Sequence, residues 1–305
     1  MEVDQRVAAR VEKYYPRNAL GDFPWGYVWT TTLPCDQCKR HFPLIGSLVL
    51  QPADQRSGAR GLSLKLLTSG DVWGVEILEG PPLQSPTYAS GMKADGRKKK
   101  GKSARCVFCG HVHPLEAVKA KCDARQAADK LLLVADKDAA GKRFFRQPTA
   151  EERKAGEGSD FGVNYGWPYA SVPNEAIPPG NVHTVMASGY GHRTFGSLMV
   201  PRQAHLFVET VETIREIHRA LLSDGFSSDY ARALASFAAS NLCRRLRRST
   251  RGATLDLTRG GVHDLFQSEC CISFSFDFFE TGLGRGAGTW ASVSRSSVRA
   301  LRKVW

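Results

Sequence analysis

The sequence has no long hydrophobic run, and this absence sets the first limit on what the protein can be. No segment of the 305 residues approaches the roughly 18 to 20 apolar residues of a membrane-spanning helix, so we expect no membrane partner. Residues 1–16 are charged and lack the apolar centre of a secretory signal, so we expect a cytoplasmic location. Eight cysteines are too few for a disulfide scaffold.

Several catalytic motifs are missing as well. The sequence contains no HExxH motif, no GxSxG motif and no Asp/Asn-Pro-Pro-aromatic tetrapeptide. The glycine-rich run at 282–288 resembles a phosphate-binding loop, but it does not lie between a clear strand and a clear helix. The sequence therefore predicts a binding module without a self-contained active site, and no residue is predicted to be catalytic.

The chain does have an excess of positive charge, and this charge is clustered. Lys and Arg number 42 against 30 Asp and Glu, which gives a formal net charge of +12. Segments 93–105, 244–251 and 295–303 carry +15 between them, so the rest of the chain stands at −3. Such clusters favour a polyanionic partner, nucleic acid above all, while solubility and helix ends are the plainer explanation.

Hydropathy patterns predict an α+β fold in four parts. We expect an N-terminal helix and loop over 1–28 and a zinc-ribbon-type antiparallel β domain over 29–148. An extended or flexible linker should follow over 149–190, and a mainly helical domain with a glycine-rich C-terminal segment over 191–305.

Individual elements can be placed within these parts. Alternating apolar residues over 62–66 and 73–77 predict one β-hairpin, and the segments 131–135 and 142–146 predict a second. A helix is expected near 115–130. Two further helices should form a helical hairpin, with Pro201 in the first turn of one and Ser228 as the N-cap of the other.

Four cysteines form two CxxC pairs, Cys35 with Cys38 and Cys106 with Cys109. Each pair places two thiolates on one tight turn, as adjacent corners of a zinc tetrahedron require. Four thiolates fill the coordination sphere, so we expect a structural zinc. A redox CxxC and coincidence are the alternatives, and a nearby histidine is a possible substitute ligand. Those histidines are His41, His111 and His113.

Two basic segments are candidate nucleic-acid contacts. One is expected to be a loop before the second CxxC pair, and the other ends the second helix of the hairpin. A solvated loop is the plainer explanation of the first. The helix dipole explains part of the second, because it favours cations there by about 0.3 to 1 kcal/mol each. The predicted contacts are Lys98, Lys99, Lys100, Lys102, Arg105, Arg244, Arg245, Arg247 and Arg248.

Three stretches of the chain together resemble one protein family. These are Trp29 to Cys38 followed by Pro43-Leu44, the pair Cys106 to Cys109 followed by Gly110, and Gly191 to Gln203. They resemble the zinc ribbon and the Thr-Phe…Arg-Gln signature of adenine-specific DNA methylases that carry an uncharacterised N-terminal domain and are associated with anti-phage defence. Arg193, Arg202 and Gln203 match that signature, and packing between hairpin and ribbon is one possible role for them.

The resemblance implies a DNA-binding or target-recognition module in DNA modification or phage defence. The family's glycine-rich S-adenosylmethionine motif and its Asp-Pro-Pro-Tyr motif are not found in these residues. S-adenosylmethionine would therefore bind only through separate catalytic segments or subunits, which become predicted partners beside DNA. The alternative is a protein–protein interaction scaffold subunit of a multi-chain defence complex.

Overall fold

The computed structural model describes residues 2–54, 58–92, 98–138, 140–158, 172–257, 259–266 and 271–303. These residues form antiparallel sheets and six α-helices, which confirms the predicted α+β class. The helices are α1 (Glu2–Val11), α2 (Leu115–Asp123), α3 (Ala150–Glu157), α4 (Pro201–Ser223), α5 (Ser228–Leu246) and α6 (Trp290–Leu301). None of the helices in the described part of the chain is long and apolar enough to cross a bilayer.

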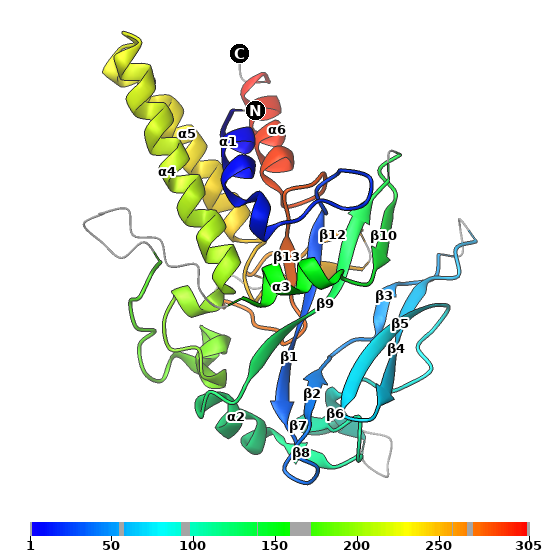
Figure 1. Ribbon diagram of the computed structural model, residues 1–305. Coiled ribbons are helices and arrows are strands. Elements are labelled where there is room, and N and C mark those ends of the chain that lie inside the picture. Colours follow the sequence, from blue (N-terminus) through cyan, green and yellow to red (C-terminus); the bar gives the residue numbers. More distant parts are fainter. Residues whose placement is uncertain are drawn as a thin grey trace.

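A five-stranded antiparallel sheet forms the centre of the molecule (Figure 1). Its strand order is β10-β9-β1-β13, and β2 pairs with β1 beyond this path. The strands are β1 (Gly26–Pro34), β2 (His41–Leu44), β9 (Ala128–Lys137), β10 (Arg143–Arg146) and β13 (Phe279–Thr281). Strands from residues 26–146 and from residues 279–281 therefore share one sheet, although the predicted division places them in separate domains.

The central strand β1 is covered on both faces. Val28 packs in a core with Leu132, Leu133 and Phe279 on one face. On the other face, Tyr27 and Trp29 belong to a second core, which also contains Val7 and Val11 of α1, Leu131, Val134 and Phe278. Because side chains alternate along a strand, consecutive large apolar residues in β1 supply both cores.

Two three-stranded sheets and a short β-pair complete the β structure. One sheet has the order β3-β4-β5 and the other the order β6-β7-β8. The hairpin of β4 and β5 and that of β9 and β10 confirm the two predicted hairpins. The strands are β3 (Val49–Gln51), β4 (Leu62–Ser69), β5 (Val72–Glu79), β6 (Tyr88–Met92), β7 (Lys98–Arg105), β8 (Val112–Pro114), β11 (Leu255–Asp256) and β12 (Gly261–Val262).

Helices α4 and α5 form the predicted helical hairpin, and α1 and α6 lie beside it at one end of the molecule (Figure 1). Pro201 is the first residue of α4, as predicted. The N-cap of α5 is Ser227 rather than Ser228, because the Ser227 hydroxyl accepts the N–H of Tyr230. The helix expected over 115–130 ends at Asp123, and Ala128 already begins β9.

The prediction of an extended or flexible linker over 149–190 is wrong for its first part, which forms α3. A capping box begins this helix: the Thr149 hydroxyl accepts the N–H of Glu152, and the Glu152 carboxylate accepts the N–H of Thr149. The Glu152 side chain is buried and pairs with Arg146 of β10 at 2.6 Å. The Thr-x-x-Glu signal is present in the sequence and is sufficient to indicate the helix.

Candidate metal centre

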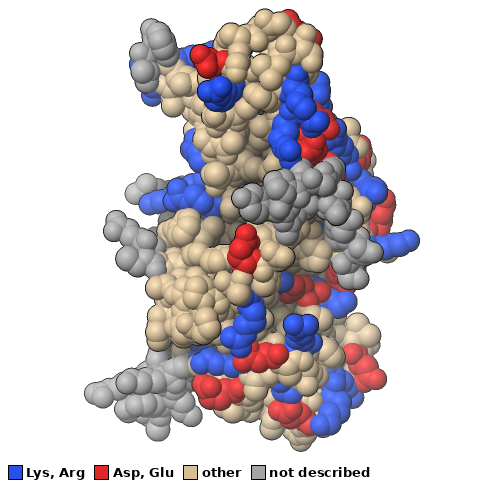
Figure 2. All heavy atoms as spheres, turned by 90° about the vertical axis from the view of Figure 1, so that its left-hand side faces the viewer, with Lys and Arg blue, Asp and Glu red and all other residues tan. Residues whose placement is uncertain are grey.

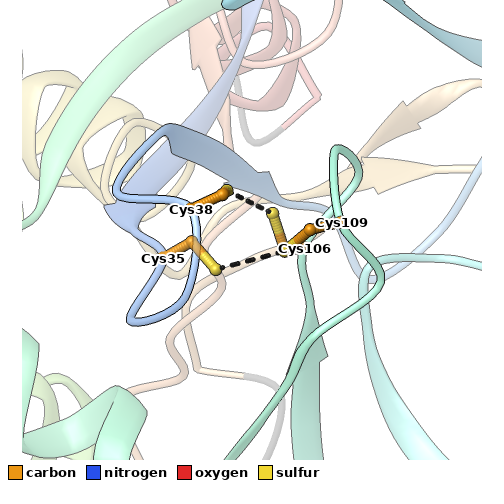
Figure 3. Close-up of side chains that lie close together, drawn as sticks. All are labelled: Cys35, Cys38, Cys106 and Cys109. Atoms are coloured by element: carbon orange, nitrogen blue, oxygen red, sulfur yellow. Dashed lines mark hydrogen bonds between the residues drawn. The ribbon is translucent and has the colours of Figure 1, made fainter.

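The four cysteines of the two CxxC pairs face one another across two loops (Figure 3). The loop after β1 carries Cys35 and Cys38, and the loop after β7 carries Cys106 and Cys109. The Sγ atoms of Cys35 and Cys109 are 3.6 Å apart, and those of Cys38 and Cys106 are 3.7 Å apart. Tetrahedral zinc with Zn–S bonds of about 2.3 Å requires sulfur atoms about 3.8 Å apart. The donor set therefore fits a zinc ion.

Backbone hydrogen bonds give the two cysteine loops the same shape. The N–H of Cys35 donates to the carbonyl of Arg40, and the N–H of Cys106 donates to the carbonyl of His111, both at 2.9 Å. The cysteine carbonyls each accept an N–H four residues later, from Lys39 and Gly110 at 3.0 Å. Both of these later residues have left-handed backbone, with φ of 62° and 74°. The two turns therefore present their pairs of cysteines in the same arrangement.

The thiols differ in how readily they ionise. Burial opposes ionisation of Cys38, but the Arg40 N–H and hydrogen bonds from the other thiols lower its pKa to about 7. Burial raises the pKa of Cys106 to about 12. Zinc binds thiolates, so a zinc ion at this site would require Cys106 to lose its proton, and the positive charge of the ion would favour that loss. A closed four-sulfur set leaves no position for a reactive water, so this site can stabilise the fold but not hydrolyse a substrate.

The nearby histidines lie outside the four-sulfur group. His113 is buried, and its Nδ1 lies 3.1 Å from a carboxylate oxygen of Asp36. Lys121 of α2 donates to the other Asp36 oxygen at 2.6 Å, and this hydrogen bond lowers the pKa of Asp36. Asp36 of the first cysteine loop is therefore joined to His113 and Lys121, which follow the second cysteine loop.

The predicted basic loop is in part a strand. Residues 98–105 form β7, which pairs with β6 and β8, while 93–97 lie outside the described residues. Lys102 and Arg105 are exposed, as a phosphate contact requires, and the side chains of Lys98, Lys99 and Lys100 also lie outside the described part. The sequence was expected to contain no P-loop, yet the run from Gly96 to Ser103 matches the P-loop pattern GxxxxGKS. A P-loop opens a helix, whereas 98–103, the part of this run that the structure describes, lies in strand β7.

The arginines at the end of α5 are mostly engaged within the protein. Arg245 is 1 % exposed and donates to the carbonyl of Gly282 at 3.0 Å, so it has no surface for a phosphate. The prediction of Arg245 as a phosphate contact is therefore wrong. Arg247 pairs with Asp264 at 3.0 Å, and Arg244 donates to the Ser297 hydroxyl of α6 at 2.9 Å. Arg248 is half-buried beside Gly288.

Two of the three signature residues have structural roles in the interior. Arg202 is fully buried and donates to both carboxylate oxygens of Glu280, its Nη2 at 2.7 Å. Gln203 accepts the Val200 N–H at 2.9 Å and so satisfies the start of α4. Arg193 differs, because its pair with Asp123 at 2.5 Å lies at the surface. Arg202 thus joins α4 to β13, and its guanidinium lies 5.1 Å from the ring centroid of Trp29 in β1, which agrees with packing of the hairpin on the predicted ribbon region.

The glycine-rich run at 282–288 packs against the chain before β1. The N–H groups of Gly282 and Gly284 donate to the carbonyls of Trp25 and Pro24 at 2.7 and 2.9 Å. A Cβ at Gly286 would stand 2.0 Å from Cδ1 of the Trp25 ring. These glycines therefore permit close packing and do not present their backbone to a phosphate.

A methyl group at position 286 is expected to weaken the fold. We expect Gly286→Ala to cost about 1 to 3 kcal/mol, the usual range for overpacking a well-filled core. Gly74→Ala is the control, because nothing lies within 4 Å of the Cβ position at Gly74. Urea unfolding measures both variants, and equal stability of the two would contradict the packing role.

Comparison with known proteins adds no relative to this picture. No protein-family model, no curated protein and no solved structure matches the chain. What can be said about function therefore comes from the residues and their geometry.

Proposed function

We propose that this protein is a zinc-stabilised DNA-binding module that works with separate catalytic chains of an adenine-specific DNA methylase-like system. In this proposal zinc fixes the two cysteine loops, and exposed basic side chains contact the phosphates. Residue-level resemblance to the methylase family supports the choice of DNA and of a modification or phage-defence setting.

The observation that carries the proposal is a basic stripe on α6 and the turn after it. We call Arg295, Arg299, Arg302 and Lys303 the α6 stripe. Their spacing places them along one side of a helix, and all four are exposed. Within the described residues, none of the four has a carboxylate partner, whereas many other surface arginines do. Unpaired exposed cations on one side of a helix suit a phosphate backbone.

On the side of the molecule that Figure 2 shows, basic and acidic side chains are interspersed. Lys102 and Arg105 of β7 are also exposed, and Arg105 directly precedes Cys106. These exposed basic side chains can be tested separately from the α6 stripe.

DNA binding across a salt series tests the proposal, with the zinc content measured on the same sample. Replacing the α6 stripe by glutamine is expected to weaken duplex binding at least tenfold. The slope of log K against log salt should also become shallower, by about 0.9 for each phosphate that the variant no longer neutralises.

The matched control removes the same charge from four arginines that are paired with carboxylates. These are Arg6, Arg17, Arg219 and Arg232, each replaced by glutamine. Equal weakening in both quadruple variants would show that only net charge matters. Absence of wild-type binding at low salt, with zinc present, would overturn the proposal.

The scaffold alternative has its own observation, at the tip of the helical hairpin. Leu222, Phe226, Tyr230 and Leu234 are each 41 to 50 % exposed, and the rings of Phe226 and Tyr230 stack at 5.4 Å. Neighbouring apolar side chains left in water favour a protein contact. If the α6 stripe proves dispensable, pull-downs comparing wild type with Phe226→Ser would test this second function.

A further inference from the structure

Two adjoining cavities lie where β6 and β7 approach the chain before β13, and neither belongs to the metal centre. The smaller has a volume of about 250 Å³ and the larger about 530 Å³. Both are lined by Gly46, Lys102, Ser275 and Asp277, so these residues stand at their junction. The junction of the two cavities therefore contains a cation, Lys102, and a carboxylate, Asp277.

Aromatic rings form the wall of the smaller cavity. Tyr190 and Phe274 are stacked, with ring centroids 5.0 Å apart and planes at 16°. Phe276 meets both of these rings edge-on at 5.2 and 5.0 Å, and Tyr88 meets Phe276 in the same way at 4.9 Å. Tyr190 and Phe274 are only half-buried. Tyr190 and Phe274 therefore cover one face of each other, and the part of each ring that stays accessible is the surface available to a ligand.

The polar groups at the junction are held in fixed positions. The Asp277 carboxylate accepts the N–H groups of Gly46 and Ser47 at 2.9 and 3.1 Å, and the Ser275 hydroxyl at 2.6 Å. These donors hold the Asp277 carboxylate at the junction, where it lines both cavities. Lys102 is exposed, and its ammonium group lies 5.1 Å from the Tyr88 ring centroid. No ion pair joins Lys102 to a carboxylate among the described residues.

These features match the parts of one nucleotide. We propose that the smaller cavity binds an unpaired nucleotide of a single strand, with its base against Tyr190 and Phe274, its phosphate at Lys102 and its amino group at Asp277. Aromatic rings bind unpaired bases by stacking, and a carboxylate accepts hydrogen bonds from an exocyclic amino group. A cation completes the site because each nucleotide carries a phosphate. This inference rests on the proposed nucleic-acid function and specifies which form of nucleic acid the protein recognises.

The test compares three fluorescently labelled probes by anisotropy: an eight-nucleotide strand of deoxycytidine, one of thymidine and an eight-base-pair duplex. We expect wild type to bind the deoxycytidine strand at least tenfold more tightly than the duplex. Thymidine should bind more weakly than deoxycytidine, because thymine has no exocyclic amino group.

Three variants separate the parts of the site. Phe274→Leu keeps apolar volume and should lower single-strand affinity about tenfold while leaving duplex binding unchanged. Lys102→Gln, at an exposed position, should lower the affinity for both the deoxycytidine strand and the thymidine strand. Asp277→Asn should abolish the preference for deoxycytidine over thymidine. Phe226→Leu, at the exposed tip of the hairpin, is the matched aromatic control. Wild-type melting temperature and zinc content are required of every variant.

The outcomes distinguish this inference from the proposed function. Salt-sensitive duplex binding with no tighter binding of either strand would overturn the nucleotide site and leave the DNA-binding proposal standing. Equal weakening of strand and duplex binding in folded Phe274→Leu would also overturn the site. Failure of wild type to bind any of the three probes would overturn both the nucleotide site and the DNA-binding proposal.

Discussion

Removal of the metal, or Cys106→Ser, is expected to abolish cooperative folding of the region around the two cysteine loops. Structural zinc sites have apparent binding free energies of about 10 to 16 kcal/mol, comparable with or larger than the roughly 5 to 15 kcal/mol that stabilises a typical domain. Cys35 and Cys106 lie in one core with Leu33, Phe42 and Val118. Loss of the ion would leave thiols at the centre of that core with nothing to join the loops.

Circular dichroism melting with a parallel measurement of bound zinc tests this prediction. Cys243→Ser is the matched control, because Cys243 is exposed on α5 and far in sequence from both loops. Lower pH should promote zinc loss, since burial raises the pKa of Cys106 and protons compete with the ion for this thiolate. An unchanged melting curve after verified zinc removal would show that the metal does not stabilise the fold.

Replacement of Arg202 by methionine is expected to cost about 3 to 5 kcal/mol. The reason is that Glu280, which is also fully buried, would keep its charge without a cation. Glu280 further accepts hydrogen bonds from the Tyr15 hydroxyl and the Trp29 indole, both at 2.7 Å. The pair therefore joins the chain after α1, strand β1, helix α4 and strand β13 at one point.

The free energies of unfolding of single and double variants, measured in urea, separate the contribution of the Arg202–Glu280 ion pair from that of the other contacts of the two residues. Arg202→Met combined with Glu280→Met should lose less stability than Arg202→Met alone, because no unpaired charge remains. Arg193→Ala is the control from the same sequence signature. Its partner Asp123 is exposed, and a surface pair contributes about 0 to 1 kcal/mol. A destabilisation below about 1 kcal/mol for Arg202→Met would refute the structural role of the buried pair.

Predictions from the sequence succeeded where the cause is local. The CxxC spacing fixes two thiols on one turn, so the cysteine group could be predicted although 67 residues separate the pairs. The two β-hairpins and the start of α4 followed from alternation and from Pro201 for the same reason. Helix α3 was also locally encoded, by Thr149 and Glu152, but its short apolar pattern gave no periodicity to detect.

By itself, then, the sequence determined the α+β class, the four cysteines that come together in one group and where positive charge is concentrated. Only the tertiary structure decided which charged side chains are exposed and which are buried or paired. Arg202 and Glu280 are 78 residues apart, and the buried Arg245 donates to the carbonyl of Gly282, 37 residues further along the chain. Composition cannot distinguish an arginine that is buried in an ion pair from an arginine of the α6 stripe that is exposed to solvent. The difference arises from contacts between distant segments, and the nucleotide site we propose likewise exists only where such segments meet.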